Sequence, residues 1–257
     1  MSKVVKKANT KFLRGHEIDD ADNVSFIRKS KRKPNTGISN LQLKEIHPLT
    51  ENQGKVFDLY NNTDQQLVLT GFPGVGKSYL ALYLSLNDLL YGDKGYEKII
   101  IIRSLVKGRE IGHLPGSVSE KQDPFFVPYY DICNDLFNRG DAAEILLKKD
   151  LIQFENTSFL RGLTFNNSIV LIDEMQNENF QGLETILCRN GKNCRMIFCG
   201  DKAQTDLLYS KNDVSGHDKF LSILANMQEV DIVKFCVDDI VRSKLIKSYI
   251  IEKMKQL

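Results

Sequence analysis

From about residue 48 onward, short apolar runs alternate along the chain with stretches of helical periodicity. Apolar runs of four to eight residues indicate buried strands, whereas apolar residues spaced three and four apart indicate amphipathic helices. Runs rich in β-branched residues, such as KIIIIRS, are typical of strands covered on both faces. Strands are therefore expected at residues 66–71, 98–104, 151–155, 168–174, 194–201 and 229–236. Helices are expected at residues 50–62, 77–92, 125–140, 141–150, 179–190, 215–227 and 243–254.

The order of these elements predicts the fold class. Strands that alternate with helices form an α/β fold with a mostly parallel sheet flanked by helices. Residues 105–124 are too rich in Gly and Pro for a regular element to be expected there. With no internal repeat in view, we expect one domain over residues 46–257, preceded by a basic, partly flexible tail over residues 1–45.

Composition changes this picture mainly at the amino-terminal end. The chain is 42% hydrophobic and 26% charged, which is enough apolar material for a core, and its net charge is +2. Residues 1–40 hold ten Lys or Arg and four Asp or Glu, a balance of +6, whereas the remainder has a balance of −4. The cluster RKSKRK at residues 28–33 is a candidate nucleic-acid contact, and a solvated tail explains it equally well.

Two further features bear on the cellular setting. No run of eighteen apolar residues is present, and the basic amino-terminal segment is not followed by the apolar stretch of a signal peptide. The five cysteines are odd in number and form no CxxC pair, which favours reduced thiols over a zinc site. These features predict a cytoplasmic protein with no membrane contact.

The segment GFPGVGKS fits the pattern G-x-x-x-x-G-K-[ST] and lies between an expected strand and an expected helix. Glycines let backbone N–H groups form a nest for phosphate oxygens, and the helix N-terminus adds unpaired donors. Lys77 would bring a full charge to the outer phosphates, and Ser78 would offer its hydroxyl to Mg²⁺. The residues expected to contact nucleotide are Gly71, Phe72, Pro73, Gly74, Val75, Gly76, Lys77, Ser78 and Tyr79.

Two other expected strands end in polar groups. Asp173 and Glu174 follow four apolar residues, at the strand end where open α/β sheets bind ligands. Asp173 is expected to hold the Mg²⁺ shell with Ser78, and Glu174 to polarise an attacking water. The segment GDKAQT follows the next strand, and its Gln204 could hydrogen-bond both a water and a γ-phosphate oxygen.

Together these motifs resemble the PhoH family of ATPases. The resemblance is carried by GFPGVGKSYLA, IIRSLVKGREIGHLPGSVSEKQDP, SFLRGLTFNNSIVLIDEMQN, FCGDKAQTDL and DDIVRSKLI, which span residues 71–246. In its length the chain is similar to the compact, phage-encoded members. The resemblance implies a RecA-like P-loop NTPase core related to superfamily 1 helicases, ATP and Mg²⁺ as cofactors, and Gln53 near the adenine. It also implies links with phosphate starvation and a homo-oligomeric ring, such as a hexamer.

Several functions fit this set of motifs. The first is ATP hydrolysis on or beside RNA or DNA, and the second is a nucleotide-gated binding or regulatory module with little turnover. A small-molecule kinase fits less well, because an acid pair at a strand end favours activation of water. Arg242 is expected to act as an arginine finger in trans at a neighbouring subunit's nucleotide, with Arg103 and Arg161 as alternatives. A pairing of Arg242 with Asp238 or Asp239 explains its position equally well.

Overall fold

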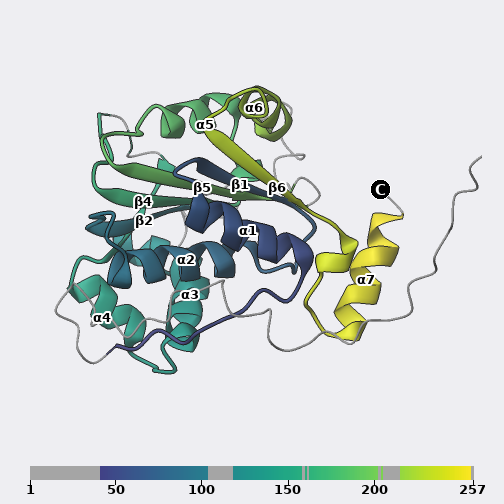
Figure 1. Cartoon of the computed structure of the whole chain (residues 1–257), viewed down its shortest axis with the longest axis horizontal. Coiled ribbons are helices and arrows are strands. Elements are labelled where there is room, and N and C mark those ends of the chain that lie inside the picture. Colours follow the sequence, from purple (N-terminus) through teal and green to yellow (C-terminus); the bar gives the residue numbers. More distant parts are fainter. Residues whose placement is uncertain are drawn as a thin grey trace, which may run out of the picture.

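The computed structural model describes residues 41–103, 118–157, 160, 162–201, 204 and 215–255, with side chains in the second segment described from residue 125. Six parallel strands form one sheet in the order β3-β2-β4-β5-β1-β6 (Figure 1). The strands are β1 (Gln66–Gly71), β2 (Lys98–Arg103), β3 (Ile152–Glu155), β4 (Ser168–Asp173), β5 (Cys194–Gly200) and β6 (Val230–Phe235). The predicted α/β class and its parallel sheet are confirmed.

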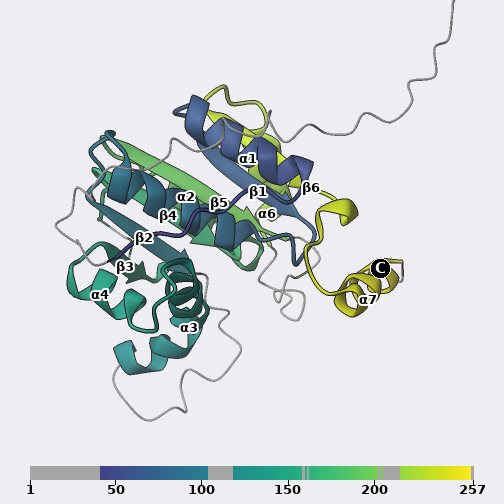
Figure 2. The same ribbon diagram turned by 60° about the horizontal axis from the view of Figure 1, so that its bottom comes forward.

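Helices cover both faces of this sheet. One face packs against α1 (Glu51–Asn62), α2 (Lys77–Tyr91), α3 (Val118–Leu136) and α4 (Ala142–Lys148). The other face packs against α5 (Phe180–Leu187) and α6 (His217–Leu224). The last helix, α7 (Lys244–Met254), stands to one side of these layers (Figure 1 and Figure 2).

Strand β2 shows why its sequence is continuously apolar. Ile99 and Ile101 belong to the core cluster under α1–α4, whereas Ile100 and Ile102 belong to the cluster under α5 and α6. Successive side chains of a strand point to opposite faces, so a strand covered on both sides needs apolar residues at every position. The same reasoning applies to β4, whose six residues are all buried.

Two predicted boundaries are wrong. Helix α3 begins at Val118, seven residues before the expected start, and residues 118–124 therefore belong to a regular element. Proline inside a helix costs about 3 kcal/mol, but Glu120, Lys121 and Gln122 are good helix formers, and the rest of α3 packs into the core. The folded body also includes residues before 46, because Leu41 and Leu43 are buried in the main core.

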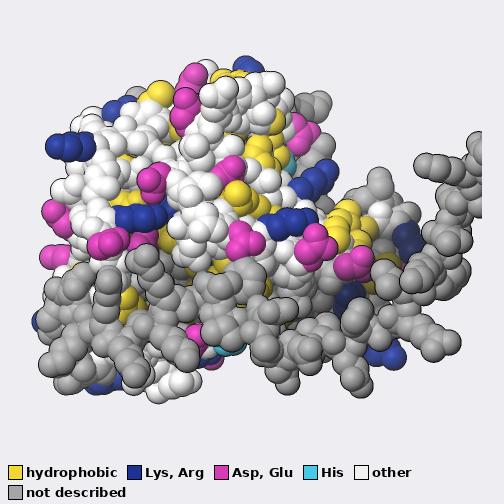
Figure 3. Space-filling view, in the orientation of Figure 1, with side chains coloured by type: hydrophobic (Ala, Val, Ile, Leu, Met, Phe, Trp, Pro, Cys, Tyr) yellow, Lys and Arg dark blue, Asp and Glu magenta, His cyan; other side chains and the backbone are white. Residues whose placement is uncertain are grey.

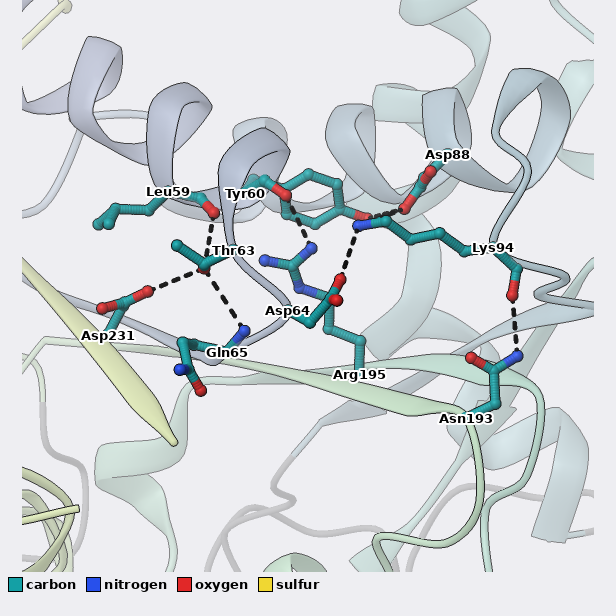
Figure 4. Close-up of polar contacts among 10 residues, drawn as sticks. All are labelled: Leu59, Tyr60, Thr63, Asp64, Gln65, Asp88, Lys94, Asn193, Arg195 and Asp231. Atoms are coloured by element: carbon teal, nitrogen blue, oxygen red, sulfur yellow. Dashed lines mark hydrogen bonds and ion pairs between the residues drawn. The ribbon is translucent and has the colours of Figure 1, made fainter. Parts of the chain in front are cut away.

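At the amino-terminal edge of the sheet, a buried arginine joins three elements (Figure 4). Arg195 of β5 is 1% exposed, donates from Nη1 to the carbonyl of Tyr60 at 2.8 Å, and stacks its guanidinium 4.0 Å from the Tyr60 ring centroid. The Tyr60 hydroxyl donates in turn to Asp88, and Lys94 lies 3.7 Å from the same carboxylate. This cluster ties the end of α1 to β5 and to the end of α2.

Among the described residues, no helix combines the length and apolar character that a bilayer crossing requires.

Candidate nucleotide-binding site

The loop after β1 has the backbone shape that a phosphate nest requires. Gly71, Gly74 and Gly76 have φ angles of +117°, +75° and +86°, a region that L-residues with a Cβ rarely adopt. A Cβ at Gly71 would lie 2.2 Å from the carbonyl oxygen of Phe235, so the close approach of β6 also requires glycine. The loop leads directly into α2, whose unpaired N–H groups face the same space.

Lys77 is the first residue of α2 and folds back over this loop. Its Nζ donates to the carbonyl oxygens of Gly71 at 3.0 Å and Phe72 at 2.8 Å. Burial lowers the pKa of Lys77, and the nearby carboxylates, Asp201 first among them, partly offset that shift. Within the described part of the chain, no carboxylate forms an ion pair with Lys77, so the ammonium is held only by neutral carbonyls.

Gln53 supports the loop from behind. Its side chain is 3% exposed, accepts from the backbone N–H of Leu49 at 2.7 Å, and donates to the carbonyl of Val75 at 2.9 Å. Val75 itself is fully buried in the core. Both ends of the Gln53 amide are therefore engaged with backbone, and the contact with adenine that was expected from the family resemblance stays a prediction.

The acid pair lies at the end of β4, as predicted. Asp173 is 7% exposed and accepts from the hydroxyl of Tyr129 at 2.7 Å and from the backbone N–H of Glu174 at 3.0 Å. Burial, followed by the charge of Asp173, raises the pKa of Tyr129 well above its usual value, so this phenol stays protonated and acts as the donor. Tyr129 comes from α3 and had no predicted role.

Glu174 adopts a left-handed backbone conformation, with φ 55°, at the turn into a short 3₁₀ helix, Met175–Asn177. Burial raises the pKa of its carboxyl group, and the charge of Asp173 raises it further. Gln176 donates from Nε2 to Glu174 and, at 3.4 Å, to the carbonyl of Gln204. The Oε1 of Gln176 accepts from the N–H of Asp201 at 2.9 Å, so one buried amide joins the ends of β4 and β5.

These groups face one cavity of about 480 Å³ at the carboxyl ends of the strands. It brings together Lys77, Ser78, Asp173 and Glu174 with Gln204 and Arg242. All four predicted catalytic residues therefore lie on one cavity. Of the other predicted nucleotide contacts, Pro73, Gly74, Gly76 and Tyr79 also line it, while Phe72 packs against the core.

Arg242 reaches the loop of its own chain. The N–H of Val241 donates to the carbonyl of Gly74 at 3.1 Å, and a Cβ at Gly74 would lie 2.8 Å from Cγ of Arg242. Among the described residues no ion pair joins Arg242 to Asp238 or Asp239. Asp239 instead accepts from Asn52 and from the N–H of Cys236; although burial opposes it, these bonds hold the pKa of Asp239 at about 2.

Of the two alternatives to Arg242, only Arg103 lies among the described residues. Arg103 lines the cavity and donates to the carbonyl of Phe125 at 2.8 Å. Arg161 lies outside the described residues, as does Thr205, which was noted with Gln204. This geometry supports a role for Arg242 within its own chain, and the role in trans stays a prediction.

The residues at the cavity fit a magnesium ion bound together with phosphate. Ser78 and Asp173 supply a hydroxyl and a carboxylate to the same cavity. Mg²⁺ prefers such oxygen donors and is usually bound by one or two protein groups, waters and substrate phosphates rather than by an all-protein cage. Consistent with this, the described residues contain no cluster of three His, Cys, Asp or Glu side chains that could hold a metal alone.

A glycine-rich loop joins β1 to α2, and the acid pair lies at the end of β4, which is separated from β1 in the sheet by β5. This arrangement defines a RecA-like P-loop NTPase core. The chain matches the family described as PhoH-like protein over residues 45–254. It is 29% identical to a PhoH-like protein of Bacillus subtilis over 249 residues, covering 92% of this chain and 76% of that one. It is 31% identical to protein PhoH of Escherichia coli K12 over 203 residues, covering 77% of this chain and 55% of that one.

The chain belongs to the PhoH-like family, which confirms the resemblance inferred from its motifs. It spans a little over half the length of the mycobacterial and E. coli relatives that it matches. Solved structures with partial likeness include the large terminase of a thermophilic bacteriophage (TM-score 0.42, 9% identity, 79% of this chain and 50% of that one). Another is the Pif1 helicase of Candida albicans (TM-score 0.37, 16% identity, 74% of this chain and 40% of that one).

Proposed function

We propose that this protein hydrolyses ATP in a Mg²⁺-dependent reaction and that turnover is coupled to RNA or DNA. The observation that carries the proposal is the meeting of Lys77, Ser78 and the acid pair, from segments about a hundred residues apart, on one cavity. Family membership and the P-loop core support a nucleotide-binding, ATPase-like protein. Hydrolysis and the nucleic-acid partner go beyond that and need their own tests.

Each group has a distinct task in this proposal. The loop N–H groups and the N-terminus of α2 bind phosphate oxygens, and Lys77 exchanges its carbonyl partners for the outer phosphates. Bound Mg²⁺ would neutralise charge on the β- and γ-phosphates. Glu174 accepts the proton of the attacking water, and its raised pKa makes it a stronger base than an exposed glutamate.

The hydrogen-bond path through Gln176 favours a second candidate, a nucleotide-gated module with little turnover. Glu174 is linked by this one side chain to the backbone of Asp201 and Gln204. A change at the γ-phosphate would therefore be passed to the segment after β5. Such a path is compatible with a nucleotide-gated module and with an ATPase. A measured rate of ATP hydrolysis therefore decides between the two functions.

The basic segment of residues 1–40 is the proposed contact with nucleic acid, because it carries the balance of +6. It lies outside the described residues, so the proposal rests on charge alone. Each phosphate contact contributes about 0.9 to the log–log salt slope on duplex DNA. Deleting the segment should therefore weaken binding and flatten that slope; equal slopes would show that it is a solvated arm.

The deciding experiment measures phosphate release from ATP and Mg²⁺, with and without single-stranded RNA or DNA, for the wild type and Lys77→Ala. We expect turnover in the wild type, stimulation by nucleic acid, and a loss of ATP affinity of about 100-fold in Lys77→Ala, because charge-assisted bonds to phosphate are lost. Titration calorimetry measures the affinity. Unchanged affinity in the folded variant would overturn the phosphate site, whereas tight binding without turnover would favour the nucleotide-gated module.

The assembly and biology remain predictions of the family resemblance. They comprise a ring of subunits, a phage origin and a link to phosphate starvation. Arg242 acting in trans is a separate prediction, made from its sequence distance to the P-loop. Mixing Lys77→Ala with Arg242→Ala tests the shared site, because partial return of activity requires that one chain's arginine serves another chain's loop.

A further inference from the structure

A histidine is buried where helix α6 meets the strand that leads into the phosphate loop. His217 is the first residue of α6 and is 4% exposed, on the face of the sheet that α5 and α6 cover (Figure 1). Figure 3 shows charged and scattered hydrophobic side chains on the outer surface over these two helices. The inner side of α6 packs on the sheet through Phe220 and Leu224, so a buried imidazole on that side needs polar partners.

His217 has two such partners. Its Nε2 lies 3.3 Å from the hydroxyl oxygen of Thr70, and its Nδ1 lies 3.0 Å from the Oδ1 of Asp218. An ionised carboxylate only accepts, so Nδ1 carries the hydrogen of that contact, and the Nε2 of a neutral ring then accepts from the hydroxyl of Thr70. Thr70 is 6% exposed and directly precedes Gly71, where the phosphate loop begins. His217 therefore holds the residue from which the loop starts.

The same end of α6 is tied to the turn after the acid pair. The N–H of Gly216 donates at 2.8 Å to the carbonyl of Glu178, the residue that ends the 3₁₀ turn following Glu174. A Cβ at Gly216 would lie 2.2 Å from the backbone nitrogen of Phe180, so the two segments pack as closely as glycine permits. Two adjacent residues, Gly216 and His217, thus connect the turn at Glu174 with the start of the phosphate loop.

We propose that His217 is a positioning residue for ATP hydrolysis, which acts through the hydroxyl of Thr70 to fix the phosphate loop relative to Glu174. The inference rests on the proposed function, because it needs phosphates on the loop and a base at Glu174. A hydrogen bond depends on direction as well as distance, so it holds α6 and β1 in one arrangement that an apolar contact would not specify. A misplacement of about 1 Å between reacting groups can cost about 100-fold in rate.

The test changes each side of this contact and measures kcat and ATP affinity separately. For His217→Leu we expect kcat to fall about tenfold, with ATP affinity within about twofold of the wild type, because Lys77 and the loop N–H groups remain. Thr70→Val keeps the shape of the side chain and should give the same loss, and the double variant should lose no more than either single variant. His217→Gln places an amide near the position of Nε2 and should restore kcat to within about threefold of the wild type.

Ser85→Ala is the matched control for a lost buried hydrogen bond. Ser85 is fully buried in α2, and its hydroxyl donates to the carbonyl of Ala81 at 2.7 Å, away from this contact. The variant should lose stability without a change in kcat. Amide hydrogen exchange adds a measurement that needs no nucleotide: His217→Leu should exchange faster than the wild type at residues 71–76 and 174–178, and Ser85→Ala should not.

These measurements separate the inference from the proposed function. An unchanged kcat in His217→Leu would overturn the inference, and so would additive losses in the double variant, because Thr70 would then not be the route. Equal losses of kcat in His217→Leu, His217→Gln and Ser85→Ala would overturn it in favour of a role in stability alone. A wild type that binds ATP without turnover, or does not bind it, would instead contradict the proposed function, and hydrogen exchange would still confirm or overturn the link between loop and turn.

Discussion

The sheet has one side where its strands begin, here called the amino edge, and one where they end, here called the carboxyl edge. Both bury charged side chains, and they do so in opposite ways. At the amino edge, the guanidinium of Arg195 is held by the Tyr60 ring and carbonyl, and Asp88 and Lys94 complete the cluster (Figure 4). At the carboxyl edge, Lys77 is held by two neutral carbonyls, while the carboxylates line the cavity around it.

The two edges differ in what compensates the buried positive charge. A buried charge is costly unless it is compensated. The Nε and Nη2 of Arg195 have no hydrogen-bond partner among the described residues, but its guanidinium stacks on the Tyr60 ring, lies within the field of the Asp88 carboxylate and does not line the cavity. Lys77 has given up water and gained only carbonyl bonds, which is why burial lowers its pKa. An anionic phosphate supplies the missing counter-charge, so the carboxyl edge is built for a ligand and the amino edge for stability.

If this comparison is correct, variants at the two edges should have separable effects. The largest is expected for Glu174→Gln, which keeps the size of the side chain and removes the base. ATP should still bind, and turnover should fall by about 100-fold or more. Glu184→Gln, on the exposed surface of α5, is the matched control and should leave turnover unchanged.

The pH dependence sharpens the same prediction. Because the folded-state pKa of Glu174 is raised, wild-type turnover should decline on acidification at a higher pH than an ordinary glutamate would give. The residual turnover of Glu174→Gln should not show this decline on acidification. A near-normal rate in Glu174→Gln would show that Glu174 is not the base and would leave Gln204 as the next candidate for orienting the attacking water.

The next largest effect is expected at the amino edge, for Arg195→Ala. The variant removes a fully buried side chain, its bond to Tyr60 and its ring contact, and the free energy of unfolding should fall by about 3 kcal/mol. Denaturant unfolding measures it, with the exposed Lys192→Ala as control. ATP affinity of the folded fraction should stay at the wild-type value; a selective loss of affinity would break the distinction between the edges.

The parts of the site that sequence could predict are the ones encoded locally. The loop of residues 71–78 carries its glycines, lysine and serine in one stretch, and Asp173 and Glu174 directly follow an apolar run. Parallel strands bring their carboxyl ends to one edge, so the meeting of these segments follows from the fold class. The same logic located Gln204.

The parts that sequence could not predict depend on contacts between distant segments. Tyr129 bonds to Asp173 across 44 residues, and nothing in the helical pattern of α3 marks its hydroxyl. Gln176 belongs to the DEMQN segment, but its role in joining the ends of β4 and β5 depends on the position of the backbone N–H of Asp201, which sequence does not show. The sequence distance of Arg242 from the loop led to the prediction that it acts at a neighbouring subunit, and that role stays a prediction. Sequence could not show that β6 returns beside β1 and brings Arg242 to the loop of its own chain.

The smallest predicted effect tests whether Tyr129 positions the metal-binding carboxylate. Tyr129→Phe keeps the buried ring and removes the hydroxyl that donates to Asp173 at 2.7 Å. One such bond is worth about 1 kcal/mol, so the Mg²⁺ concentration for half-maximal turnover should rise about fivefold, and stability should change by a similar small amount.

Tyr83→Phe separates positioning from stability. The Tyr83 hydroxyl accepts from the N–H of Ile46 at 3.4 Å, and its ring is buried under the same face of the sheet, away from the acid pair. It should lose stability without a change in Mg²⁺ dependence. If both variants leave the Mg²⁺ dependence at the wild-type value, Tyr129 serves packing alone, and the carboxyl edge holds Asp173 through the backbone N–H of Glu174.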